Sequence, residues 1–146
     1  MDTTTFKQKI KIEAENIGFK KFKNSFTVET KDSLIFLIPR KSGYSNKYYL
    51  RVKVELKPYN EEFNQDKYIR HDAGDVMLSL DSEHPKIFDL TNDISDLERS
   101  NSLEIFFREN VKSWINILSE KERIINYYRS GKLFLLPYTK NKIGIE

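Results

Sequence analysis

Three carboxylates and a lysine have the residue types that could hold a metal ion and activate a water molecule. Glu55 and Lys57 are two positions apart at the end of a predicted strand. Asp32 lies at the start of an earlier predicted strand, and Glu13 falls on the first predicted helix. Carboxylate oxygens are the ligands that Mg²⁺ prefers, and a nearby lysine can polarise the attacking water. The chemistry to weigh is therefore metal-assisted hydrolysis.

This order of residues resembles the catalytic set of Mg²⁺-dependent nucleases of the restriction-endonuclease type. Lys31, however, occupies the position before Asp32 where that set usually has proline. Strict alternation also places the glutamate and the lysine on the same predicted strand face as Arg51 and Lys53. Such a row is typical of a solvated face with cross-strand charge pairs, and we favour that interpretation.

Other catalytic or metal-binding patterns lack residues that they need. The chain has no cysteine, which excludes cysteine nucleophiles, cysteine metal sites and disulfides. Its two histidines are His71 and His84, and a phosphohydrolase site built on His71-Asp72 would need more. The Gly-x-Ser-x-Gly elbow of serine hydrolases does not occur. We expect no catalytic residue, no metal site and no cofactor.

Charge is distributed unevenly along the 146 residues, although the net charge is only +3. Residues 1–57 carry 13 basic and 6 acidic side chains, residues 58–109 carry 5 and 13, and residues 110–146 carry 7 and 3. A solvated surface can show such segregation, but so can a charged docking face for a partner. For a basic partner, the acidic segment 58–109 offers these candidate contact residues: Asp72, Asp75, Asp81 and Glu83.

A basic and aromatic connector follows the first predicted helix, from Gly18 to Phe26. Lysines interleaved with phenylalanines could form a platform on which the bases of single-stranded nucleic acid stack. We favour the alternative, in which Phe19, Phe22 and Phe26 anchor the helix exit in the core while the lysines stay in water. Nucleic acid is therefore not the partner that we expect.

Hydrophobic periodicity predicts the elements that would position these residues. It predicts helices over 4–17, 103–118 and 120–130, the last with a capping box of Ser119 and Glu122. Strands are predicted over 26–30, 34–38, 48–57 and 76–80, with a short strand or extended edge over 87–90. In the central strand 48–57 the predicted core residues are Leu50, Val52, Val54 and Leu56, and the predicted wet row is Arg51, Lys53, Glu55 and Lys57.

This order of elements predicts an α+β fold. It would contain an N-terminal helix, an antiparallel sheet of about four strands and two or three C-terminal helices packed on one face. We expect one domain over residues 1–137 and a polar tail over residues 138–146 that frays. The N-terminus does not match a signal peptide and no apolar run is long enough to span a membrane, so a soluble cytoplasmic protein is expected.

Three stretches of the sequence resemble a bacterial domain family of unknown function. They are Gly18-Phe-Lys-Lys with Phe26, Lys41-Ser42 with Tyr44 to Asn46, and the central strand from Tyr48 to Leu56. Arg40 stands where the family usually has glutamine. The resemblance covers about residues 5–130 and implies an N-terminal helix, a meander of strands and a helical C-terminal half. Some members lie beside polymorphic-toxin genes, which implies an immunity role.

The expected function is that of a non-enzymatic binding protein of the immunity type, which neutralises a protein toxin through a charged face. No membrane contact is expected. The alternative is a nucleic-acid-associated protein or an Mg²⁺-dependent nuclease that uses Asp32, Glu55 and Lys57. In that alternative the residues expected to contact nucleic acid are Lys20, Lys21, Lys23, Arg51 and Lys53.

Overall fold

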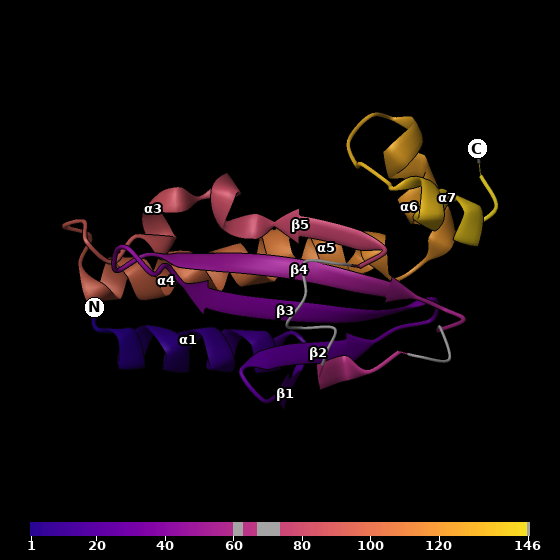
Figure 1. The fold of residues 1–146 in the computed structure, drawn as a ribbon. Helices are drawn as coiled ribbons and strands as arrows, with labels where there is room; N and C mark the ends of the chain where they lie inside the picture. The colour runs from indigo at the N-terminus through magenta and orange to yellow at the C-terminus, as the bar shows by residue number, and fades with distance from the viewer. Residues whose placement is uncertain (60–62, 67–73, 146) are drawn as a thin grey trace.

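The predicted antiparallel meander is present and has five strands in place of about four. The computed structural model describes residues 1–59, 63–66 and 74–145. Helix α1 (Thr3–Asn16) is followed by β1 (Lys20–Phe22), β2 (Ser25–Glu29), β3 (Ser33–Lys41), β4 (Tyr48–Leu56) and β5 (Val76–Ser79). The strands form one sheet in chain order, and every neighbouring pair is antiparallel (Figure 1). The additional strand, β1, lies in the basic connector.

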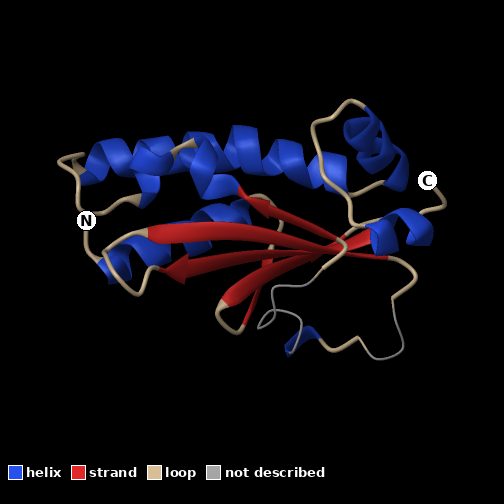
Figure 2. Ribbon diagram, turned by 45° about the horizontal axis from the view of Figure 1, so that its top comes forward, coloured by secondary structure: helices blue, strands red, loops and turns tan. Residues whose placement is uncertain are grey.

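The C-terminal half is helical, as predicted. It begins with η1 (Leu80–Glu83) and α3 (Pro85–Phe88), and it continues through α4 (Asp96–Phe106), η2 (Phe107–Val111), α5 (Lys112–Leu118), α6 (Lys121–Arg129) and α7 (Pro137–Lys142). Figure 2 shows that α4, η2 and α5 run on as one long helix beside the sheet. The turn η2 is π-helical, and the consecutive residues Phe106 and Phe107 at its start are both buried.

The main core lies between the sheet and the helices α1 and α4–α5. The four inward residues predicted for the central strand are 0 to 3% exposed, which confirms them as core. Phe6 and Ile10 of α1 join the same cluster, and the ring of Phe6 lies 4.8 Å from that of Tyr48. The apolar stripe of α1 therefore holds this helix against the start of β4.

The opposite face of the sheet is not the wet face that alternation predicts. Lys53 is 1% exposed and Glu55 is 7% exposed, so the predicted solvated row is largely buried. Phe36 of β3 is opposite Lys53 in register, and Tyr59 and Phe63 pack over the strip that Phe36 belongs to. The prediction fails because Tyr59 and Phe63, which come after β4, pack on this face, and strand periodicity cannot reveal such a contact.

Two further predictions are wrong in detail. The short strand predicted over 87–90 is not formed, because α3 ends at Phe88; only Asp89 has the extended conformation of the other alternative, and it forms an isolated bridge with Lys47. Helix α6 is not capped by Ser119. Instead the carboxylate of Asp32, in the turn between β2 and β3, accepts a 2.9 Å hydrogen bond from the backbone amide of Lys121. The cap is supplied from 89 positions away, so no local pattern could predict it.

The segment predicted as a fraying tail contains helix α7. Thr139 is fully buried and its hydroxyl donates a 2.8 Å hydrogen bond to the carbonyl oxygen of Asp75. Ile143 and Ile145 pack against the main core. None of the helices formed by the described residues is both long and apolar enough to cross a bilayer.

Candidate partner-binding site

The residues proposed for metal-assisted hydrolysis are held by separate structural contacts. Asp32 caps α6, whereas the ammonium of Lys57 lies 2.9 Å from a carboxylate oxygen of Glu29. That hydrogen bond raises the pKa of Lys57. Glu13 pairs with Lys9 one helical turn away, at 2.9 Å. Each of these side chains is therefore engaged in its own structural contact, and these contacts do not bring the side chains together as a metal site.

Glu55 belongs to a buried ion cluster with Asp75 and Lys142. The ammonium of Lys142 lies 3.0 Å from Glu55 Oε1 and 2.8 Å from Asp75 Oδ2. The same oxygen of Asp75 accepts a 2.8 Å hydrogen bond from the amide of Leu56. Within the described ranges, no group of three or more histidine, aspartate or glutamate side chains is placed to hold a metal ion. The ion cluster joins α7 to β4 and β5, and its contacts suit this structural role better than a metal centre.

The basic and aromatic connector anchors the exit of α1, as the favoured interpretation predicts. Phe19 and Phe26 are 3% and 5% exposed and belong to the main core, and Phe22 is half-buried. Lys20, Lys21 and Lys23 are exposed. The buried rings cannot stack on nucleic-acid bases, because bases need an open ring face.

The four candidate contact residues lie in different surroundings. Asp72 lies outside the described residues. Asp75 is 3% exposed and bound to Lys142, so its carboxylate is not part of the surface. Asp81 accepts hydrogen bonds from the amide of Leu50 and the hydroxyl of Ser79, and it lines a surface groove. The structure thus leaves Asp81 and Glu83 of this set near one another at η1.

Glu83 is exposed, but its carboxylate fixes the long helix to η1. Its two oxygens accept hydrogen bonds from the indole of Trp114 at 3.0 Å and the amide of Asn110 at 3.1 Å. The same amide lies 3.3 Å from a ring nitrogen of His84, and the His84 ring stands edge-on to Phe106. His84 is therefore part of this small docking contact, and His71 lies outside the described residues.

The groove beside η1, hereafter the acidic groove, has a volume of about 690 Å³ and runs between the start of β4, α3 and the start of α4. Four carboxylates and two lysines line it: Asp81, Asp89, Asp93, Glu98, Lys47 and Lys86. Hydrogen bonds from the hydroxyl and amide of Thr91 lower the pKa of Asp89, which keeps this carboxylate ionised. Asp93 and Glu98 are exposed, and neither carboxylate has an ion-pair partner among the described residues. These two charges remain available to a ligand.

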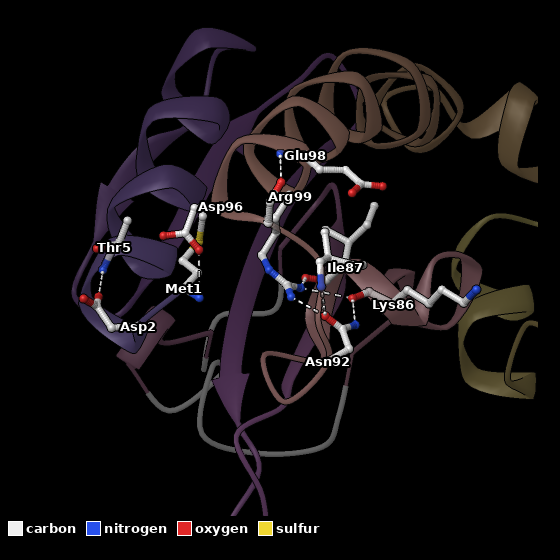
Figure 3. Close-up of polar contacts among 11 residues, drawn as sticks. Met1, Asp2, Thr5, Lys86, Ile87, Asn92, Asp96, Glu98 and Arg99 are labelled. Carbon is white, nitrogen blue, oxygen red and sulfur yellow. Dashed lines mark hydrogen bonds and ion pairs between the residues drawn. The ribbon is translucent and has the colours of Figure 1, made fainter.

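Arg99 braces the wall of the acidic groove from within. Its side chain is 1% exposed and points away from solvent, toward the loop that follows α3 (Figure 3). The guanidinium donates hydrogen bonds to the carbonyl oxygens of Lys86 and Ile87, at 3.0 and 2.6 Å, and to the side chain of Asn92. Burial lowers the pKa of Arg99. The groove wall is thus fixed before any partner arrives.

Sequence reasoning did not single out Asp93, Glu98 or Arg99. The first two lie within the acidic segment 58–109, so the charge imbalance indicated the segment that contains them but not these residues. Arg99 carried a weaker signal, as one of only five basic residues in that segment. Only the tertiary structure separates the exposed carboxylates from those that are already bound.

The chain has no recognisable relative in the comparisons. No protein-family model, no curated protein and no solved structure matches it. The geometry of the described residues is therefore what carries any statement about function.

Proposed function

We propose that the protein is a non-enzymatic binding protein of the immunity type, which acts in the cytoplasm and holds a basic protein toxin at the acidic groove. The observation that carries this proposal is the pair of exposed carboxylates, Asp93 and Glu98, on a wall that Arg99 holds rigid. Complementary charge at an interface raises the association rate and selects the partner. A preformed wall reduces the ordering that binding would otherwise require.

The nuclease alternative receives less support. Its two carboxylates serve a helix cap and a buried ion cluster, and its lysine is paired with Glu29. Of the basic residues expected to contact nucleic acid in that alternative, Lys53 is 1% exposed. A phosphate backbone could not reach this side chain without opening the sheet face.

The test is co-expression with the product of the neighbouring gene, followed by binding kinetics on the purified pair. We expect a stable complex, and we expect the double variant Asp93→Asn/Glu98→Gln to associate about tenfold more slowly at low salt. The effect should shrink as the salt concentration rises, because exposed charges are screened.

A matched control removes two exposed carboxylates elsewhere, in Glu15→Gln/Glu122→Gln on α1 and α6. This variant should bind like the wild type. The proposal fails if no complex forms, or if the two double variants slow association equally, since the effect would then come from net charge alone.

A further inference from the structure

A second groove, hereafter the basic groove, runs between α1 and the strands β1 to β3, with Tyr48 of β4 at its floor. Its volume is about 720 Å³. Six basic side chains and no acidic one are among its lining residues: Lys7, Lys11, Lys21, Lys23, Arg40 and Lys41. A concave surface lined by one sign of charge concentrates an oppositely charged ligand.

Four of these lysines converge because of where the elements place them. Lys7 and Lys11 lie one turn apart on α1, so they share a side of the helix. Lys21 is opposite Phe26 in register, and Lys41 is opposite Tyr48. Phe26 and Tyr48 belong to the main core, so Lys21 and Lys41 extend from the sheet face that α1 covers. Helix and sheet thus present lysines to the same groove.

Ion pairs neutralise this charge only in part. Lys23 lies 2.7 Å from Asp66, and Lys11 lies 3.8 Å from Glu15. The side chains of both pairs are roughly half exposed, and pairs of this kind are weak and easily exchanged for another anion. Lys7, Lys21 and Lys41 are exposed. The groove lining therefore carries more positive charge than these two ion pairs neutralise.

The composition of the groove favours phosphate over a protein ligand. Lysine is depleted in protein–protein interfaces, where arginine and exposed aromatic residues are enriched, whereas lysine binds phosphate as a point charge. The aromatic rings of the groove floor are buried: Phe6 and Tyr48 are 0% and 3% exposed. Bases therefore have no open ring to stack on, and contact would be confined to the phosphates.

Tyr48 provides a neutral donor at the floor of the same groove. Its hydroxyl is buried, and the side chain of Thr3 is the polar group that interacts with it. Burial raises the pKa of the phenol, so the group stays protonated and able to donate.

We propose that the basic groove binds the phosphodiester backbone of nucleic acid without reading its bases. This site differs from the set of basic residues expected to contact nucleic acid in the nuclease alternative, because only Lys21 and Lys23 belong to both sets. Tyr48 lines both grooves, but all the other lining residues differ, so the proposal does not depend on the partner proposed for the acidic groove.

The experiment measures binding of the full chain to a fluorescent single-stranded oligonucleotide as a function of salt. We expect two oligonucleotides of unrelated sequence to bind equally. The variant Lys7→Gln/Lys11→Gln/Lys21→Gln/Lys41→Gln should bind at least about tenfold more weakly at 50 mM salt. Its slope of log K against log salt should be shallower by roughly 3, since each phosphate contact on a single strand contributes about 0.7.

The matched control removes four exposed lysines outside the groove, in Lys20→Gln/Lys31→Gln/Lys112→Gln/Lys132→Gln. Lys20 is the neighbour of Lys21 on β1 and lies on the opposite face of the sheet. The control should keep most of the affinity and the slope, and both variants should melt cooperatively like the wild type.

Three outcomes overturn the proposal. They are no binding by the wild type at 50 mM salt, equal loss in the two quadruple variants, and displacement of the oligonucleotide by polyglutamate as effectively as by unlabelled oligonucleotide. The last result would assign the groove to an acidic protein segment.

Discussion

The central strands β3 and β4 are covered on both faces of the sheet, but by different chemistry. On the face covered by α1 and α4–α5, apolar side chains meet one another, as Leu50 and Phe6 illustrate at 0% exposed each. On the opposite face, aromatic residues of the chain after β4 cover part of the surface, and an ion cluster of Glu55, Asp75 and Lys142 covers another. The first face is held by burial of apolar area, which needs no particular partner, whereas the second depends on one lysine at the correct place.

This difference predicts where a single substitution does the most damage. Lys142→Met keeps the length of the side chain but removes the ammonium that the buried carboxylates of Glu55 and Asp75 share. Breaking a buried ion cluster in this way costs about 3–5 kcal/mol, so we expect a loss of that size in the free energy of unfolding measured in urea. The double variant Glu55→Gln/Lys142→Met should recover part of the loss. If Lys142→Met lowered the free energy of unfolding by less than the loss of an exposed ion pair does, the ion cluster would not be what stabilises the second face.

On the first face, Leu50→Ala should cost about 2–5 kcal/mol, because it removes apolar contacts and leaves a cavity. The loss should be nearly the same at pH 7 and at alkaline pH, since no titrating group takes part. Urea unfolding at the two pH values measures this. A strong pH dependence of the loss would contradict the division between the two faces.

The smallest predicted effect is an alkaline loss of stability that depends on Lys142. Burial by itself lowers the pKa of Lys142, but hydrogen bonds to Asp75 and Glu55 outweigh it, and the net shift is upward. The folded state therefore holds this proton more tightly than the unfolded chain does. The stabilisation is complete below the ordinary lysine pKa of 10.5 and disappears as the pH rises through the folded-state value.

Urea unfolding at pH 7 and above pH 10.5 should show a larger alkaline loss in the wild type than in Lys142→Met. Buried tyrosines also titrate in this range, but they are present in both proteins and cancel in the comparison. An equal alkaline loss in the two proteins would remove Lys142 as its cause.

The sequence was sufficient to predict the face whose packing is apolar. The alternation of Leu50, Val52, Val54 and Leu56 reports burial directly, and it is confirmed. For the opposite row the same argument gave a wrong prediction of solvent exposure. Alternation shows that a charged residue points to that face, but it does not show whether the side chain contacts water or a distant lysine. Lys142 comes 87 positions after Glu55 in the chain, and no periodicity links them.

The candidate site shows the same division between composition and position. The excess of acidic residues over 58–109 indicated the region that lines the acidic groove. It could not tell Asp75, which is locked beneath α7, from Asp93, which is exposed. The basic groove was harder to foresee, because its lysines come from a helix, a hairpin and the end of a third strand, and only the register of β1 and β3 brings them together.

The ion cluster of Glu55, Asp75 and Lys142, which holds α7 on the sheet, also has a consequence for protein synthesis. Asp75 leaves the peptidyl-transferase centre 67 residues ahead of Lys142, an interval of roughly 3–13 s at ribosomal elongation rates of about 5–20 residues per second. During that interval the nascent sheet can form its first face, while the carboxylates of the second face still require water. We therefore expect the β4–β5 edge to close only after the C-terminal helix has emerged, which makes this edge the part of the nascent chain most in need of protection by chaperones.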